Sequence, residues 1–201
     1  MNNQNKPRAT TSTQTLVMYA LLTAIVIVLQ LMGSFIRFGP FSISLVLVPI
    51  VIGAALCGKA AGAWLGFVFS AVVLFTDCAA FYAVNIPGTV ITVLVKGITA
   101  GFCAALVYGL LQKRNKTLAV IAAAAVCPIV NTGLFLIGCR LFFMDLLNTW
   151  AASLGFATLG DYVIFSLIGG NFIFELVINL VLSPVIVRLI QYRTGKKLAL
   201  V

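Results

Sequence analysis

Long runs of apolar residues, separated by short polar or charged stretches, follow one another along the whole chain. A transmembrane helix needs about 20 predominantly apolar residues to cross the hydrocarbon layer of a bilayer. By this criterion the pattern predicts spanning helices at residues 16–33, 41–57, 60–76, 88–112, 118–143 and 162–192. The expected fold is an all-α integral membrane protein with six transmembrane helices.

Two of these runs depart from the average length. The second and third are short, and only the dipeptide "GK" separates them, which predicts a tight helical hairpin. The last run is long and contains Pro184. Because proline lacks a backbone N–H, we expect it to kink this helix or to end its spanning portion.

Composition agrees with a membrane location. The 201 residues are 62% hydrophobic and 8% charged, whereas soluble domains carry about 25% charged residues. The formal net charge is +9. The basic residues punctuate the apolar runs instead of forming one basic face, so we expect the lipid bilayer, and not nucleic acid, as the partner of this surface.

The basic residues also predict the orientation, because loops on the cytoplasmic side carry an excess of Lys and Arg. With the N-terminus inside, the inner segments hold most of the 13 basic residues: Lys6, Arg8, Lys59, Lys113, Arg114, Lys116, Arg188, Arg193, Lys196 and Lys197. Asp77, Asp145 and Asp161 then fall outside. Both termini are expected in the cytoplasm, as a polar tail at 1–15 and a basic tail at 193–201 around the membrane domain at 16–192.

The sequence contains few of the residue patterns that enzymes use for catalysis. The chain has no histidine, which removes histidine metal ligands and the usual general base. The acidic residues are scattered, and the cysteines Cys57, Cys78, Cys103, Cys127 and Cys139 form no CxxC pair. There is also no GxxxxGK[ST] phosphate loop. We expect no enzyme activity, no catalytic residues, no cofactor and no metal site.

A lysine interrupts the run "TVITVLVKGITAGFCAALVYGLLQKRN", and its position raises the main functional question. Lys96 lies about 12 Å below Gly88 at 1.5 Å per residue, in the outer half of the membrane. Asn131 on the fifth predicted helix, and Asn171 and Glu175 on the sixth, reach neighbouring depths. Charged groups in hydrocarbon are expensive, so these residues should face inward and find partners.

Three explanations of these polar groups remain open. One is a structural Lys96–Glu175 ion pair with asparagines that bridge the helices. Another is snorkelling of Lys96 to the outer headgroups. The third, which we favour, is a polar pocket that opens outward and binds a ligand. The outer connections are longer than the inner ones, and long loops are usually functional.

These outer loops supply further candidate contacts. Aromatic residues there serve either as interfacial anchors or as a lid over a pocket. The candidate ligand contacts from loops and helix ends are Tyr82, Asn85, Arg140 and Trp150.

Small residues at spacings of four recur on several predicted helices. Ala20 and Ala24 lie four apart on the first, and Gly97 and Gly101 repeat the spacing on the fourth. Such faces let helices approach closely. We expect most of the glycines to serve packing within the bundle.

Three segments together resemble a known family. They are "RFGPFSISLVLVPIVIGAALCGKAAGAWLGFVFSAVVLF", "VLVKGITAGFCAALVYG" and "PIVNTGLF". The order of a Gly-rich outer loop, a Ser-Leu-Pro second helix and a glycine run at Gly58, Gly62 and Gly66 is similar to the S components of energy-coupling factor (ECF) transporters. The resemblance covers about residues 14–192, and its nearest group includes carriers of riboflavin, folate, pantothenate and pyridoxine.

The resemblance implies a function and partners. An S component captures a water-soluble vitamin from outside and docks on a membrane coupling subunit, the T component, which sits on two ABC ATPases. It implies a multi-pass protein of a bacterial plasma membrane. Ala20 and Ala24 match the family's docking motif. Lys96, Asn131, Arg140, Asn171 and Glu175 fall where family binding sites lie.

Two other functions remain open from the residues alone. A stand-alone secondary transporter would favour internal repeats, and we find no convincing one. A non-transporting assembly protein would leave the buried polar groups unexplained. For the vitamin itself, Lys96 and Arg140 favour a carboxylate such as pantothenate, whereas the loop aromatics favour stacking on riboflavin.

Overall fold

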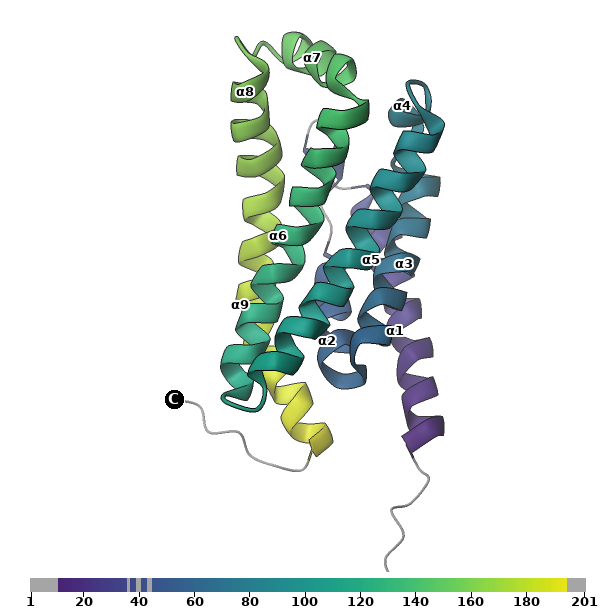
Figure 1. The fold of residues 1–201 in the computed structure, drawn as a ribbon, viewed down its shortest axis with the longest axis vertical. Helices are drawn as coiled ribbons and strands as arrows, with labels where there is room; N and C mark the ends of the chain where they lie inside the picture. The colour runs from purple at the N-terminus through teal and green to yellow at the C-terminus, as the bar shows by residue number, and fades with distance from the viewer. Residues whose placement is uncertain (1–10, 36, 39–40, 43–44, 195–201) are drawn as a thin grey trace, which may run out of the picture.

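The computed structural model describes residues 11–35, 37–38, 41–42 and 45–194, which form an elongated bundle of helices (Figure 1). The helices and strands, in chain order, are α1 (Thr11–Gly33), β1 (Arg37–Phe38), β2 (Phe41–Ser42), α2 (Leu47–Cys57), α3 (Lys59–Thr76), α4 (Ala79–Tyr82), α5 (Ile86–Leu111), α6 (Lys116–Phe142), α7 (Met144–Ser153), α8 (Leu159–Tyr162), the π-helix η1 (Val163–Phe172) and α9 (Ile173–Thr194). The polar tails predicted at 1–10 and 195–201 lie outside the described residues.

Five helical segments among the described residues are long and apolar enough to cross a membrane. They are Thr13–Gly33, Lys59–Thr76, Ile86–Leu111, Lys116–Phe142 and Leu159–Arg188. Each coincides with a predicted span, so the all-helical membrane fold is confirmed. The predicted count of six is not confirmed, because the second apolar run behaves differently.

That second run forms a short helix inside the bundle. Helix α2 begins at Leu47, not at residue 41, and its 11 residues cover only about 16 Å. It packs against α1, α3, α5, α6 and α9, and Leu47, Ile50 and Val51 are fully buried. Its sequence is apolar on every side because protein surrounds it, which is the same pattern that lipid would demand.

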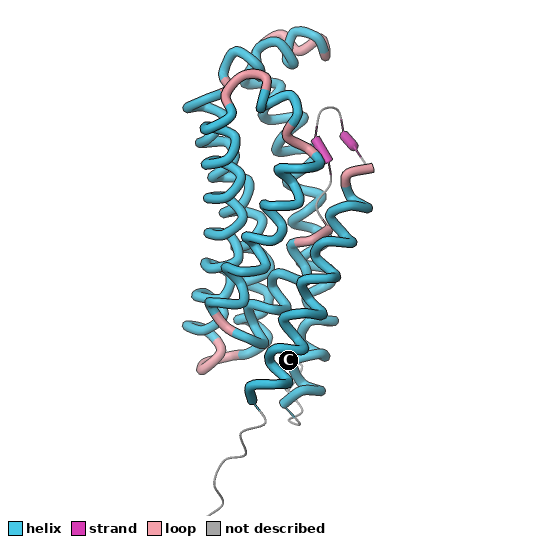
Figure 2. The backbone as a smooth tube through the Cα atoms, turned by 90° about the vertical axis from the view of Figure 1, so that its right-hand side faces the viewer, coloured by secondary structure: helices cyan, strands magenta, loops and turns pink. Residues whose placement is uncertain are grey.

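Helix α2 begins inside the bundle, and the residues before it form its connection to α1. Pro49 lies in its first turn, where a missing N–H is tolerated. The residues before the helix form the two-residue strands β1 and β2, which pair antiparallel with Arg37 opposite Ser42 (Figure 2). Ile50 faces Gly101 of α5, so α2 begins about one turn further out, near the depth of Lys96.

Helices α3 and α5 approach each other closely at a set of facing glycines. A Cβ atom on Gly62 would meet the carbonyl of Gly101, and one on Gly66 would meet the carbonyl of Gly97. Ser70 Oγ donates to Val93 O at 2.7 Å across the same crossing. The prediction that these glycines serve internal packing is confirmed.

The last span contains two irregularities. It begins as α8, continues as the ten-residue π-helix η1, and then becomes α9. Pro184 lies inside α9, and the helix continues beyond it to Thr194. Pro184 thus does not end the helix, whereas the apolar span ends one turn after it, at Arg188.

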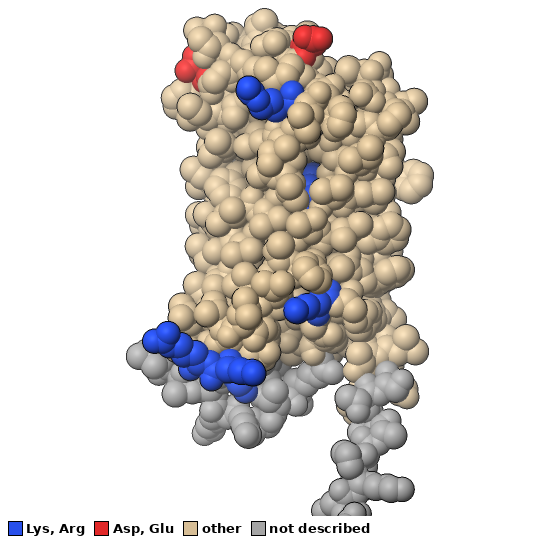
Figure 3. All heavy atoms as spheres, viewed as in Figure 1, with Lys and Arg blue, Asp and Glu red and all other residues tan. Residues whose placement is uncertain are grey.

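The two ends of the bundle differ in structure and charge. Short helices α4, α7 and α8 cap one end, and the start of α1 and the end of α9 both lie at the other (Figure 1). Most Lys and Arg side chains gather at the uncapped end, whereas the acidic side chains visible in this view lie at the capped end (Figure 3). The surface between the ends is apolar over most of its area, with exposed Leu21, Phe75 and Ile137 among many others.

Candidate functional site

Lys96 lies inside the bundle, between two phenylalanine rings. Its Nζ is 5.6 Å from the centre of the Phe69 ring on α3 and 4.8 Å from that of Phe135 on α6. Phe69 is fully buried, and Lys96 is partly buried. A cation over an aromatic face gains roughly 0.5–2 kcal/mol, so the two rings hold the ammonium group in the apolar interior.

The glycine crossing of α3 and α5 explains why the lysine meets Phe69. Gly97 follows Lys96, and Gly66 lies three residues before Phe69. A Cβ on Gly97 would meet Ser70 Oγ and approach the Phe69 ring. The two backbones therefore come close enough for a side chain of α5 to lie along a ring of α3.

Glu175 provides the opposite charge. Among the acidic side chains near Lys96, Glu175 acts on it more strongly than Asp77 does. Glu175 is 2% exposed on α9, and Asn179, one turn further along, donates from Nδ2 to its backbone carbonyl at 2.8 Å. The predicted convergence of Lys96 and Glu175 from different helices is thus present in the fold.

Asn131 adds a polar group about one turn inward from Phe135. It is 5% exposed on α6, and within the described ranges its buried Oδ1 has no hydrogen-bond partner. Thr92, one turn outward from Lys96, packs against Gly138 of α6, and its hydroxyl is also buried without a partner. Polar groups that are neither hydrated nor paired are rare in folded proteins and need an explanation.

Aromatic rings cover this region on the capped side. Phe81 of α4 lies at the centre of the aromatic group, with ring centres 5.9 Å from Phe135, 5.0 Å from Phe143 and 5.4 Å from Trp150. All three pairs are edge-to-face, an arrangement that aromatic rings favour. Trp150, one of the predicted contacts, therefore belongs to the aromatic cover, and Phe135 connects that cover to Lys96.

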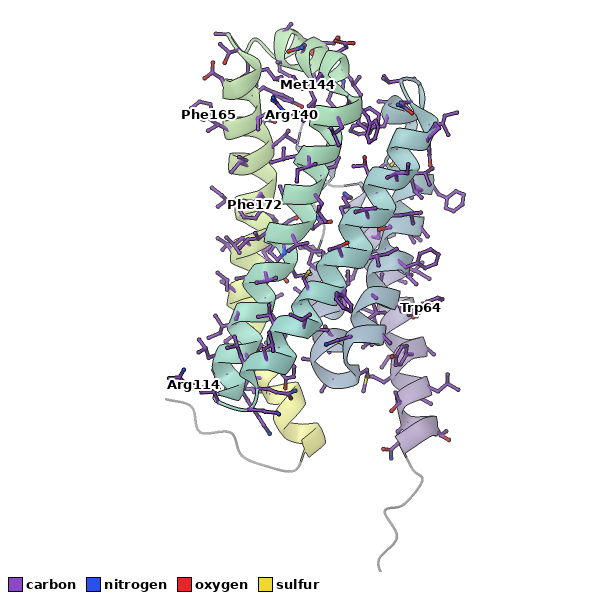
Figure 4. All side chains as sticks on the ribbon, in the orientation of Figure 1. Trp64, Arg114, Arg140, Met144, Phe165 and Phe172 are labelled. Carbon is purple, nitrogen blue, oxygen red and sulfur yellow. The ribbon has the colours of Figure 1, made fainter. Side chains whose placement is uncertain are left out.

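The other predicted contacts have different surroundings. Tyr82 donates its hydroxyl to Leu74 O at 3.0 Å. Asn85 caps α5, because its Oδ1 accepts from the N–H of Gly88 at 2.9 Å. Arg140 is exposed near the capped end of α6 (Figure 4). Asn171 belongs to η1, and its side chain lies outside the described residues.

Sequence reasoning missed a partly buried polar cluster at the outer ends of α1 and α3. Gln30 Nε2 and Ser34 Oγ donate to Asp77 Oδ2 at 3.1 and 3.0 Å, and Thr76 Oγ1 donates at 2.9 Å. Gln30 is fully buried. A signal was available: Leu22, Val26 and Gln30 repeat at intervals of four, so Gln30 stands where a buried apolar residue is expected.

The predicted docking residues lie on the outer surface of the bundle. Ala20 and Ala24 are exposed on α1, among exposed apolar residues that include Leu16, Leu21 and Val28. On the same helix Thr23 accepts a hydrogen bond from Trp64 of α3, which is labelled in Figure 4, at 3.1 Å. The small residues therefore face away from the bundle.

The arrangement provides binding groups: one ammonium, two carboxylates, several amides and a cluster of rings. Within the described ranges, no three His, Cys, Asp or Glu side chains come together in a way that would hold a metal ion. Such a site suits a small molecule with both polar and flat apolar parts. A multi-pass membrane protein with this site near one face belongs to the broad class of membrane proteins that handle small molecules.

Comparison with known families defines the class more closely. The family model of the ECF transporter substrate-specific component matches residues 14–187. The match covers most of the chain, which therefore belongs to the family of substrate-specific components of ECF transporters. The resemblance inferred from the sequence is confirmed, and the chain is a substrate-specific transporter subunit. No curated protein sequence matches it.

Proposed function

We propose that this subunit captures a water-soluble vitamin from outside the cell and delivers it through a T component and two ABC ATPases. The observation that carries the proposal is the position of Lys96, held between Phe69 and Phe135 with Glu175 as its electrostatic partner. A charged group inside a membrane bundle is costly and usually marks a functional site. The family supports a small-molecule substrate in general.

The vitamin is pantothenate-like or riboflavin-like. Lys96 favours a carboxylate or another acceptor, because its ammonium group has only donors to offer. The rings of Phe81, Phe135 and Trp150 favour a flat or apolar portion of the ligand. Arg140 is exposed at the same end of α6, where it adds positive charge at the approach to the site.

The chain itself has no catalytic role in this proposal. Its acidic residues are few, and its sequence contains no phosphate loop, so hydrolysis of ATP belongs to the partner subunits. Docking on the T component uses the exposed face of α1 around Ala20 and Ala24, where small residues permit close helix contact.

In the proposed orientation the capped end lies outside and both termini lie in the cytoplasm. Support comes from the excess of Lys and Arg at the uncapped end (Figure 3), as cytoplasmic loops require. A cysteine-free variant with a cysteine introduced at exposed Ala80 should react with an impermeant thiol reagent from outside, and one with a cysteine at Lys113 should not. Native Cys78 is a poor probe, because it is 3% exposed and burial raises the pKa of its thiol to about 11. The reverse labelling pattern would put the site on the cytoplasmic side.

Mass spectrometry of the small molecules that the purified protein retains tests the binding step directly. Co-purification with a membrane coupling subunit and two ATPases tests the assembly. A vitamin bound without these partners, together with uptake by the chain alone in vesicles, would favour a stand-alone secondary transporter. The absence of any retained or titratable vitamin would favour a non-transporting assembly protein.

A further inference from the structure

Gln30 is a polar residue on the buried, otherwise apolar face of α1. Leu22 and Val26 lie one and two turns before it on the same face, and all three are buried. Gln30 itself is 0% exposed, although glutamine is mostly found at protein surfaces. Its polar head therefore needs partners inside the protein.

Half of the Gln30 amide has such a partner. Its Nε2 donates to Asp77 Oδ2 at 3.1 Å. An ionised carboxylate only accepts hydrogen bonds, so the NH₂ group, and not the oxygen, must face Asp77. This removes the usual ambiguity between the amide nitrogen and oxygen.

The other half has none. Gln30 Oε1 is buried and has no hydrogen-bond partner among the residues that the structure describes. Ser34 and Thr76 donate to the same oxygen of Asp77, at 3.0 and 2.9 Å. They hold in place the carboxylate that in turn orients the Gln30 amide. The result is an acceptor oxygen fixed in place inside the outer part of the bundle, without a donor.

This acceptor lies in the same half of the bundle as the proposed binding site. Asp77, which orients Gln30, is close enough to act electrostatically on Lys96. Gln30 is about one turn from the end of α1, and Asp77 follows the end of α3, next to the capping helix α4 (Figure 1). Gln30 on α1 and Lys96 on α5 therefore both lie in the outer half of the bundle.

We propose that Gln30 is a substrate-binding residue, whose Oε1 accepts a hydrogen bond from an N–H or O–H group of the vitamin. The inference rests on the proposed function and sharpens it. A buried acceptor held ready without a donor is satisfied when a ligand supplies one. Asp77 is the positioning residue, because it accepts a hydrogen bond from Nε2 of the same amide and so fixes the direction of Oε1.

The proposal narrows the substrate chemistry. The ligand must carry a donor for Gln30 in addition to an acceptor or anionic group for Lys96. Pantothenate combines a carboxylate with hydroxyl and amide donors, and riboflavin combines ring carbonyls with hydroxyl and ring N–H donors. A purely anionic ligand without donors would leave Gln30 unsatisfied.

The test compares Gln30→Met with Ser34→Ala. Each variant removes one hydrogen bond to Asp77, but only Gln30→Met also removes the buried acceptor. Riboflavin, pantothenate, folate and pyridoxine are titrated calorimetrically into the wild-type protein and both variants. For the vitamin that the wild type binds, Gln30→Met should weaken the affinity about tenfold, whereas Ser34→Ala should change it less than about twofold.

The outcomes separate the inference from the proposed function. If the wild type binds a vitamin and Gln30→Met binds it equally well, the inference fails and the proposed function stands. An equal loss of affinity in both variants would assign the cluster to helix packing and also overturn the inference. If the wild type retains and binds none of these vitamins, the proposed function fails, and the inference fails with it.

A second pair of variants covers the case in which Gln30→Met does not fold. Gln30→Met combined with Asp77→Leu removes both partners of the buried bond, which leaves no unpaired group between them. Ser34 and Thr76 keep acceptors in the backbone carbonyls of Gln30 and Val72. Against Asp77→Leu alone, the double variant should again bind the vitamin about tenfold more weakly, and equal affinities would overturn the inference.

Discussion

Two stripes of small residues in this protein share a sequence pattern and have opposite environments. Gly62 and Gly66 on α3 face Gly97 and Gly101 on α5, so closely that no Cβ fits between the backbones. Ala20 and Ala24 on α1 have the same spacing, yet they are exposed on the outside of the bundle. The glycine stripe has its partner within the chain, whereas no described helix covers the alanine stripe.

The difference shows what a small-residue stripe reports. Spacings of four indicate a surface on which helices can approach closely, but not which helix approaches. The glycine stripe also sets the site, because its crossing brings Phe69 to Lys96. The exposed alanine stripe fits the proposed contact with a T component. Four predictions test this division, from the largest expected effect to the smallest.

The largest effect is expected on transport. Ala24→Trp should abolish vitamin uptake in cells, since a bulky side chain separates backbones that small residues bring together. Vitamin affinity and the melting temperature of the isolated protein should stay as in the wild type, because Ala24 is exposed. Radiolabelled uptake and co-purification of the T component provide the measurements.

Ile129→Trp is the matched control for this variant. Ile129 is 50% exposed on α6, on another part of the apolar surface, so tryptophan there should leave uptake unchanged. Normal uptake by Ala24→Trp would show that the alanine stripe has no docking role. Equal loss of uptake in both variants would indicate a general effect of surface tryptophan.

The glycine stripe should respond in stability instead. Gly101→Ala places a Cβ against the backbone of Gly62, which cannot move without shifting α3. Overpacking of this kind should lower the free energy of unfolding by about 3 kcal/mol. Gly109→Ala, in the same helix, meets only Gln112 at 4.0 Å and should be neutral or slightly stabilising. Similar melting temperatures for the two variants in detergent would contradict the close crossing.

A smaller effect is expected on vitamin affinity when Lys96, which the glycine crossing brings to Phe69, is replaced. Lys96→Met keeps much of the side-chain stem and removes the ammonium group. If the lysine contacts an anionic group, vitamin binding should weaken by about 2 kcal/mol, or roughly thirtyfold. Calorimetric titration of the vitamin measures the loss.

The double variant Lys96→Met with Glu175→Gln separates binding from structure. A purely structural pair predicts that Lys96→Met lowers the melting temperature and that the double variant recovers it, with vitamin affinity unchanged throughout. Weak binding that persists in the stable double variant assigns Lys96 to the ligand. Full affinity in that variant would leave Lys96 as scaffold only.

The smallest effect concerns the attachment of the alanine stripe to the bundle. The indole N–H of Trp64 donates to Thr23 on α1, at a partly exposed position. Trp64→Phe and Thr23→Val should each destabilise the protein slightly, with a coupling energy of about 0.5 kcal/mol in a double-mutant cycle. A coupling energy of zero, from melting of all four proteins, would show that this bond does not hold α1.

Much of the fold was predictable because long apolar runs have few alternatives in a membrane. Helices α1, α3, α5 and α6 coincide with predicted spans to within about five residues. The span predicted at the second run is not confirmed, since a helix wrapped by protein and a helix in lipid both require apolar residues on every side. Only the packing of α2 against all five long helices distinguishes the two.

A residue of the candidate site was predictable from the sequence where its polarity differed from that of its neighbours along the chain. Lys96 stood out because a charge in an apolar run is rare and expensive. Gln30 did not, because a neutral amide near a helix end is unremarkable until its burial and its contact with Asp77 are known. Asn85 was singled out as a polar loop residue, and its side-chain oxygen serves the start of α5.

The sequence by itself determined that this protein is embedded in a membrane and where most of its helices run. It also determined that Lys96 is a charged residue within an apolar helix. These properties depend on local composition and on the length of each run. The tertiary structure alone decided that α2 fills the interior and that the glycine stripe faces inward and the alanine stripe outward. It also decided that Gln30 meets Asp77 and that Lys96 lies over the rings of Phe69 and Phe135. Those outcomes depend on which surfaces meet, and residues distant along the chain meet only when the whole bundle packs.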